Sequence, residues 1–130
     1  WDWRERRCVR TLVGHADQIT GLAFDPRGGK LASSSSDGTA RVWDLRVDPE
    51  PRVLRGHERD VNALAYHKDG RWLATGGRDG TIRIWDVEAG ETIHVLRGAG
   101  TPVMAVAFSP DGRRLASAQG DGTGTIWDME

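Results

Sequence analysis

The chain has 130 residues, with 18 basic and 19 acidic side chains, a formal net charge of −1 and one cysteine, Cys8. This length allows at most one ordinary domain. The balanced charge gives no overall attraction to nucleic acid or to an anionic membrane, and a lone cysteine excludes an internal disulfide. No apolar run approaches 18 residues, so the sequence predicts no transmembrane helix. The charged start predicts no signal peptide, and we expect a reducing, cytoplasmic location.

The dipeptide Trp-Asp opens the chain at position 1 and recurs at positions 43, 85 and 127, with a constant step of 42. The three units between these points read LVGHADQITGLAFDPRGGKLASSSSDGTARVWD, LRGHERDVNALAYHKDGRWLATGGRDGTIRIWD and LRGAGTPVMAVAFSPDGRRLASAQGDGTGTIWD. A fixed repeat of this length predicts a row of similar structural units. Because the chain begins with the end of such a unit, and without Met, we expect an excised or processed piece.

The first predicted element is a strand formed by Cys8, Val9, Arg10, Thr11 and Leu12. Each later unit then predicts four short strands, which in the second unit are roughly 61–66, 72–76, 81–85 and 92–96. Asp-Gly pairs such as Asp69-Gly70 and Asp79-Gly80 separate these strands, and they favour tight hairpin turns because Gly adopts positive φ without steric cost. No segment has a helical period over ten residues. The sequence therefore predicts an all-β chain of antiparallel meanders.

Gly14-His15, Gly56-His57 and the stretch AFDPRGGKLASSSSDGTARVWD with its counterparts closely resemble the WD40 repeat of β-propellers. The resemblance covers the whole chain and implies four-stranded blades arranged in a ring, usually of four to eight. We expect three such blades. The predicted divisions are an overhang with an outer strand at 1–11, repeats at 12–53 and 54–95, and a third repeat at 96–130 that lacks its outer strand.

The resemblance also implies a buried hydrogen-bonded tetrad in each blade. The tetrad of the first repeat is His15, Ser33, Asp37 and Trp43, and that of the second is His57, Thr75, Asp79 and Trp85. A buried carboxylate needs donors, which an imidazole and a hydroxyl can supply. In the third repeat Ala99 replaces the histidine and leaves Ser117, Asp121 and Trp127. Since Gly124 also weakens a strand of this repeat, we predict that the third blade is the least stable.

Chemical interpretations of these residues are weaker than the structural one. Ser33, His15 and Asp37 superficially match a hydrolase triad, but the set is repeated and tied to a tryptophan, so no catalytic residue is predicted. No pair of histidines or cysteines has the close spacing of metal ligands, and no metal or cofactor is predicted. The basic cluster Arg4, Arg6, Arg7 and Arg10 has little aromatic interleaving beyond Trp3 and is interrupted by Glu5, so it predicts a solvated loop and outer strand more than a nucleic-acid site.

Surface recognition remains, and by resemblance it uses the narrower face of the ring around the channel mouth. The residues expected there are Gln18, Thr20, Ser36, Asp60, Asn62, Arg78 and Met104, with Pro102 and Gly120 in the third repeat. Arg78 is the first candidate because its planar guanidinium beside Asp60 suits a carboxylate or an amide. The alternative is that Asp60 and Arg78 only pair with each other.

Three blades are fewer than the smallest usual ring, and the order of strands suggests how the ring closes. The last blade lacks its outer strand, whereas the chain begins with a spare one at Cys8–Leu12. An unpaired edge strand is a template for such addition. We expect a non-catalytic scaffold that self-associates by strand exchange into six blades as a homodimer or nine as a homotrimer. In that ring Trp1 would be displaced from any tetrad by Trp127 of a neighbouring copy.

Alternatives remain open at this point. The chain could instead be a fragment of a larger single-chain propeller, for which the resemblance implies a bacterial signalling context. It could also carry a face that binds a small ligand or nucleic acid, and strongly salt-dependent binding would favour nucleic acid.

Overall fold

A computed structural model describes residues 4–8, 10–47 and 50–130 of the chain, and these residues form eleven β-strands in three antiparallel sheets. The strands are β1 (Ile19–Phe24), β2 (Lys30–Ser35), β3 (Thr39–Asp44), β4 (Arg52–Arg55), β5 (Val61–Tyr66), β6 (Trp72–Gly77), β7 (Thr81–Asp86), β8 (Glu91–Arg97), β9 (Val103–Phe108), β10 (Arg114–Gln119) and β11 (Gly124–Asp128). The described residues include no helix long and apolar enough to cross a membrane.

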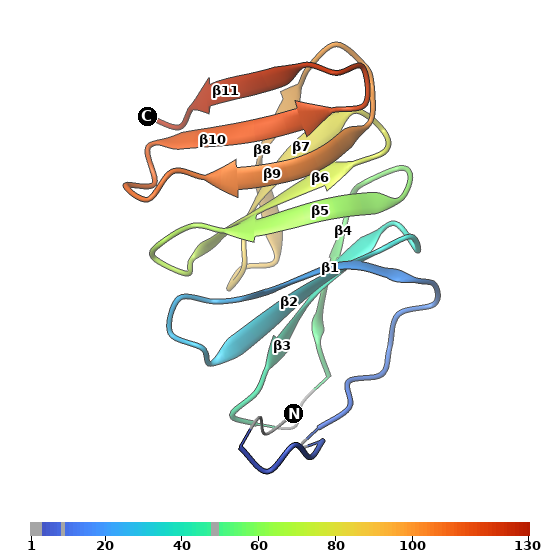
Figure 1. The fold of residues 1–130 in the computed structure, drawn as a ribbon, viewed down its shortest axis with the longest axis vertical. Coiled ribbons are helices and arrows are strands. Elements are labelled where there is room, and N and C mark those ends of the chain that lie inside the picture. The colour runs from blue at the N-terminus through green and yellow to red at the C-terminus, as the bar shows by residue number, and fades with distance from the viewer. Residues whose placement is uncertain (1–3, 9, 48–49) are drawn as a thin grey trace.

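Each sheet is a meander in which consecutive strands pair, so each sheet is one blade. The first blade has the order β1-β2-β3-β4, the second β5-β6-β7-β8, and the third β9-β10-β11. The blades are stacked along the long axis of the molecule, with the start of the chain beside the first blade and its end beside the third (Figure 1). The third blade has three strands, which agrees with the prediction that it lacks an outer strand.

Turn chemistry and strand register repeat from blade to blade. Gly80 follows Asp79 in the turn between β6 and β7 with φ of 80°, a conformation that L side chains rarely adopt. The pairings Ala40↔Leu54 and Ile82↔Leu96 occupy the same place in the first and second blades. The constant 42-residue step is therefore also a constant register, and a pairing seen in one blade can be transferred to another.

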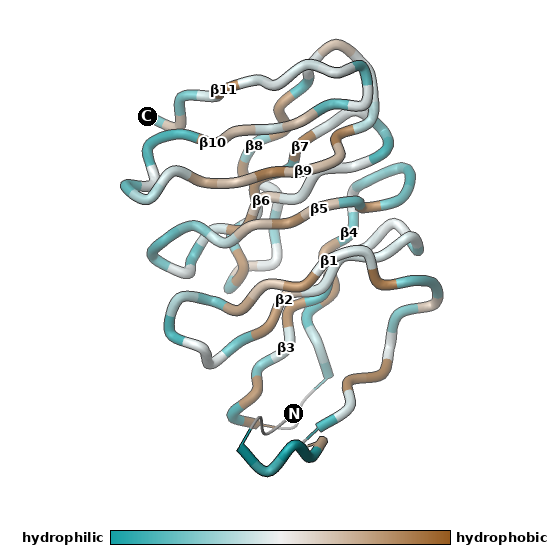
Figure 2. Tube along the Cα trace, in the orientation of Figure 1, coloured by the Kyte–Doolittle hydropathy of each residue, from teal (hydrophilic) through white to brown (hydrophobic). Residues whose placement is uncertain are grey.

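Two apolar clusters hold the three blades together. The face of each sheet that meets the preceding blade is called its front, and the face that meets the following blade is called its rear. The first cluster joins the rear of the first blade to the front of the second and comprises Ala32, Ala40, Val42, Leu54, Leu64, Tyr66, Leu73, Trp85 and Val87. The second joins the second and third blades through Ala74, Ile82, Ile84, Leu96, Val103, Val106, Phe108, Leu115, Trp127 and Met129. Hydrophobic positions gather on the strands, and the turns are mostly hydrophilic (Figure 2).

The two outermost faces of the arc have no blade against them. On the front of the first blade, Leu22 is 61% exposed and Phe24 is 63% exposed, whereas their counterparts Leu64 and Tyr66 pack in the first cluster. On the rear of the third blade, Ile126 is 66% exposed. Large apolar side chains gathered on one face mark a surface that a partner covers.

The described residues of the predicted closure strand belong to none of the three sheets of the single chain. Cys8, Arg10, Thr11 and Leu12 lie in an irregular segment before β1, and Val9 falls outside the described residues. Trp1 also falls outside them, so its predicted displacement stays a prediction. Pairing of this segment was expected only between chains, and it too stays a prediction.

Candidate functional site

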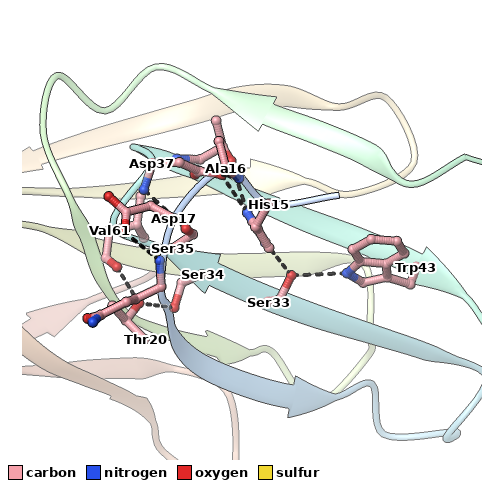
Figure 3. Close-up of polar contacts among 12 residues, drawn as sticks. His15, Ala16, Asp17, Thr20, Ser33, Ser34, Ser35, Asp37, Trp43 and Val61 are labelled. Atoms are coloured by element: carbon pink, nitrogen blue, oxygen red, sulfur yellow. Dashed lines mark hydrogen bonds and ion pairs between the residues drawn. The ribbon is translucent and has the colours of Figure 1, made fainter. Parts of the chain in front are cut away.

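The tetrad of the first blade forms a continuous hydrogen-bonded chain between three segments (Figure 3). His15, before β1, places Nδ1 2.8 Å from Asp37 Oδ2 and Nε2 2.7 Å from Ser33 Oγ. Trp43 on β3 donates its indole N–H to Ser33 Oγ at 3.0 Å. The Asp37 carboxylate also accepts the hydroxyl of Thr39 at 2.6 Å. The segment leading into the blade is thereby fastened to the turn between β2 and β3.

The second blade repeats this network with Thr75 in place of the serine. His57 Nδ1 lies 3.0 Å from Asp79 Oδ2, and Nε2 lies 2.7 Å from Thr75 Oγ1. Trp85 donates to Thr75 Oγ1 at 2.8 Å. Because an indole nitrogen can only donate, the Thr75 hydroxyl proton points to His57, whose other nitrogen then donates to Asp79. The hydrogen bonds among His57, Thr75, Asp79 and Trp85 are all satisfied when the histidine is neutral and the aspartate is ionised.

The pKa values of this pair agree with that proton arrangement. Burial lowers the pKa of His57 from its ordinary value, and this outweighs the attraction of the Asp79 charge. Burial alone would raise the pKa of Asp79, but hydrogen bonds from Thr81 and from the Glu58 backbone lower it to about 2. In the first blade, hydrogen bonds from Thr39 and His15 likewise overcome burial and hold the pKa of Asp37 far below its ordinary range.

The first-blade network has the connectivity of a hydrolase triad without the surroundings that hydrolysis needs. Ser33 is 1% exposed, and its oxygen already accepts the indole N–H of Trp43. A nucleophile must reach a substrate beside donors for the developing oxyanion, and a buried oxygen on a strand cannot do so. The geometry is therefore that of an internal fastener between strands, as the sequence predicted.

The third blade builds its network from a residue that the sequence analysis did not identify. Gln119 is buried at the end of β10, and its side-chain amide donates to Ser117 Oγ at 2.7 Å. Trp127 donates to the same oxygen at 3.0 Å. Gln119 thus takes the place of the histidine that Ala99 replaces. The available signal was the 42-residue step, which aligns Gln119 with Gly77.

The surroundings of Gly77 show why a tetrad histidine and a glutamine at the end of the strand compete for the same space. A Cβ added to Gly77 would collide with His57 Nδ1 and with a carboxylate oxygen of Asp79. In the first blade the equivalent residue is Ser35, which is buried and has a Cβ beside an intact histidine network, so the end of the strand needs a small residue but not only glycine. In the third blade the missing imidazole leaves room, and the Gln119 side chain occupies it.

Asp121 finds its hydrogen-bond partners in its own turn. Its Oδ1 accepts the Thr123 hydroxyl at 2.6 Å and the Thr123 backbone N–H at 3.0 Å. These bonds from Thr123 lower the pKa of Asp121. The carboxylate is exposed, so it caps the turn without joining Ser117 or Trp127 to the segment before the blade.

The residues expected on the narrower face come together in pairs, one pair from each blade. Backbone hydrogen bonds join Ser36 N to Gln18 O at 2.9 Å, Arg78 N to Asp60 O at 2.8 Å and Gly120 N to Pro102 O at 2.9 Å. Arg78 is exposed, and no ion pair between the side chains of Arg78 and Asp60 is found in the described part of the chain. Arg78 is therefore joined to Asp60 through its backbone, and its side chain is exposed.

Thr20 and Asn62, also expected on this face, contact the following blade. The Thr20 hydroxyl donates to Val61 O at 2.5 Å, and the Asn62 amide donates to Val103 O at 3.1 Å. Both side chains stand second in the first strand of their blade and reach the first residue of the next. These contacts clamp neighbouring blades, while Thr20 stays exposed and Asn62 is half-buried. Their expected place on the partner face stays a prediction.

The described histidines outside the tetrads have structural surroundings. His67 is buried between Trp72 and Phe108, with Nε2 3.1 Å from Gly112 O. His94 lies on β8 and is exposed. Among the described residues, no group of three or more His, Cys, Asp or Glu side chains could hold a metal ion. In the basic cluster, Arg7 Nε pairs with Glu5 Oε2 at 2.7 Å.

Three blades with repeated networks define the class of the molecule, an arc of β-propeller-type blades. The family model described as WD domain, G-beta repeat matches residues 6–44, 49–86 and 90–128. The chain therefore belongs to the WD40-repeat family, whose members are generally non-catalytic scaffolds for protein interaction.

Curated relatives match short parts of this chain. The nuclear distribution protein PAC1 of Gibberella zeae is 49% identical over 45 residues, which cover 35% of this chain and 10% of that protein. The Notchless protein homolog of Arabidopsis thaliana is 45% identical over 42 residues, or 32% of this chain and 9% of that protein. Human Striatin-4 is 58% identical over 33 residues, or 25% of this chain and 4% of that protein. Each match spans a tenth or less of the relative.

Proposed function

We propose that the protein is a non-catalytic scaffold whose copies join head to tail into a closed propeller and present the narrower face to a protein partner. The observation that carries this proposal is the pair of uncovered end faces. The exposed front of the first blade lies 42 residues before the front of the second blade, and the second blade uses that front to pack against the first. The exposed rear of the third blade lies 42 residues after the rear of the second blade, which packs against the third.

Side-chain sizes support contact between the two end faces. The cluster at the first junction contains the small Ala40 and the large Leu64. At the second the larger Ile82 accompanies the smaller Val106. A junction between copies would bring Gly124 to Leu22, again a small residue with a large one. Close packing requires this compensation of volume.

Open space beside one glycine at each end of the arc, Gly28 and Gly122, supports the same pairing of ends. A Cβ on Gly70 would lie 3.4 Å from Pro26 of the preceding blade, and one on Gly80 would lie 3.1 Å from Gly100 of the following blade. The equivalent positions Gly28 and Gly122 have nothing within 4 Å. Each end of the arc thus has an open place at a position that is filled inside the arc.

One contact of the segment before β1 supports strand exchange. Arg52 of β4 donates to Ala89 O of the following blade at 3.4 Å. Arg10, 42 residues earlier, donates to Val47 O at 3.3 Å, and Val47 corresponds to Ala89. Arg10 thus contacts the first blade as an outer strand of a preceding blade would. A second copy would supply β11 as the strand for it to pair with.

The mass in solution tests self-association. Light scattering at micromolar concentration should give a multiple of the 14.3 kDa chain mass, with two copies and six blades as the expected result. A well-folded monomer across the concentration range would overturn the proposal. In that outcome the end faces would be covered by further blades of a longer chain, which is the alternative.

A thiol cross-link tests the exchange of strands in particular. The pairings Arg41↔Val53 and Arg83↔Val95 transfer by the 42-residue step to Thr125↔Thr11. In a Cys8→Ser background, Thr11→Cys with Thr125→Cys should give a covalent dimer or closed oligomer with a short thiol cross-linker. Opposed side chains in a sheet lie about 5 Å apart.

The matched control pairs Thr11→Cys with His94→Cys, which is more exposed than Thr125 but lies on β8, away from the junction. Equal cross-linking of both pairs would show random collision and would count against strand exchange.

The partner face is proposed around Arg78. A planar guanidinium that is free of its neighbouring carboxylate suits a carboxylate or an amide of a bound peptide. Arg78→Ala should abolish capture of an acidic peptide in a peptide-array screen of the assembled protein, and Arg78→Lys should weaken it. A set of bound peptides that is unchanged in Arg78→Ala would remove Arg78 from the proposal.

A further inference from the structure

The second residue of the first strand in each blade differs in a way that concerns the junction between copies. Thr20 and Asn62 stand at this position in the first and second blades, and each donates a hydrogen bond to the following blade. The third blade has Met104 there. A thioether has no N–H or O–H to donate. The clamp that fastens both internal junctions therefore has no donor at the third position.

The acceptor side of the missing clamp also differs from its counterparts. The internal clamps end on the carbonyl oxygens of Val61 and Val103, whose side chains are buried beneath the preceding blade. The residue 42 positions before Val61 is Ile19, which is 52% exposed in the single chain. Met104 is 55% exposed. The Met104 sulfur accepts a contact from the Asn62 amide at 3.9 Å, and the rest of its side chain is open. Two half-exposed apolar side chains thus lie at the two positions that a junction between copies would bring together.

We infer that Met104 of one copy packs against Ile19 of a second copy, and that this apolar contact replaces the interblade hydrogen bond at the junction between copies. The inference rests on the proposed self-association, and the Met104–Ile19 contact would be one of the contacts on which that association depends. Methionine suits the position because its flexible side chain adapts to an irregular surface. The contact removes apolar surface of both residues from water, whereas the Ile19 carbonyl is left to solvent.

This arrangement makes the junction between copies different in kind from the junctions within a chain. The internal junctions combine apolar packing with a directed hydrogen bond, and the junction between copies relies on packing at this point. A charge at position 104 should therefore separate copies without unfolding the blades. An amide at position 104 should act as Asn62 does and donate to the Ile19 carbonyl.

Sedimentation velocity over a concentration series, on the full chain, tests the inference with three variants. Met104→Lys should weaken association about tenfold or more, because the junction would bury an unpaired ammonium group. Met104→Asn should associate at least as tightly as the unmodified chain. The control is Ile93→Lys, which places the same charge at a partly exposed apolar residue of the outer strand β8 and should leave association unchanged.

The outcomes separate this inference from the proposal beneath it. A monomeric unmodified chain would overturn self-association itself. An assembling chain whose Met104→Lys variant associates as tightly would overturn only the Met104–Ile19 contact, and so would an equal loss in Ile93→Lys or a tenfold loss in Met104→Asn. The thermal midpoint, measured at a concentration at which all variants are monomeric, should be similar in all four proteins. A large drop for Met104→Lys alone would assign Met104 to the fold and not to the junction.

Discussion

The second and third blades have the same strand frame and fasten it in different ways. In the second blade a neutral histidine, a threonine and an ionised aspartate link the segment before β5 to the turn between β6 and β7. In the third blade Gln119 satisfies Ser117 from within the same strand, and Asp121 caps its own turn. The comparison teaches that the buried hydroxyl must be satisfied, whereas the long-range tie supplied by the histidine is dispensable to the strand pairing.

The largest expected effect separates the two aspartates. Asp79→Ala removes the acceptor for His57, Thr81 and the Glu58 backbone, and it should lower the free energy of unfolding by about 2–4 kcal/mol. Asp121→Ala removes only an exposed turn cap and should cost much less. Urea denaturation at one fixed protein concentration measures both values, and equal losses would contradict the comparison.

The mutual exclusion of histidine and glutamine can be tested by exchange. Gly77→Ala should destabilise the protein by about 1 kcal/mol, because the added methyl group crowds His57 and the network must shift to the arrangement that accommodates Ser35 in the first blade. Ala99→His alone should be destabilising because Gln119 already fills the space. Combining it with Gln119→Gly should recover most of that loss. Additive losses in the double variant, measured by thermal unfolding, would mean that the two residues do not share one site.

Acid should act on the second blade before the third. Because the folded-state pKa of His57 is lowered, the unfolded chain binds more protons just below pH 6.5, and stability falls as the pH drops through that value. The lowered pKa of Asp79 adds a further loss as the pH falls from about 4 towards about 2. The third-blade network contains no histidine. Hydrogen exchange, corrected for its intrinsic pH dependence, should therefore show β7 losing protection between pH 7 and 5 and β11 changing less.

The smallest expected effect concerns Gly124 at the start of β11. A Cβ there would meet its nearest atom, Ser117 O, at 3.7 Å, so alanine fits as Ala40 does in the first blade. Gly124→Ala should stabilise the protein by about 0.5–1 kcal/mol, because the unfolded chain loses freedom. Calorimetry at fixed concentration measures this change, and a lower midpoint would show that the strand requires glycine.

Much of the fold followed from the repeat because turn chemistry and apolar alternation are local. Asp79-Gly80 predicted its hairpin, and Ser33, Asp37 and Trp43 fell into one network as the resemblance implied. Gln119 was missed because its role depends on an absence elsewhere, the lost imidazole at Ala99. The interblade bonds of Thr20 and Asn62 were not predicted, because a short polar side chain near a rim can bond to solvent or to the next blade, and the stacking of the blades decides which.

The sequence by itself determined three repeated meanders, their register and the missing strand of the last one, because hairpins are specified by residues close together in the chain. Only the tertiary structure decided how each buried hydroxyl is satisfied, which polar side chains clamp neighbouring blades and which apolar faces remain open. The clamps join residues 41 positions apart, and the hydroxyl bonds depend on space that other segments leave open, so a one-dimensional pattern does not contain that geometry.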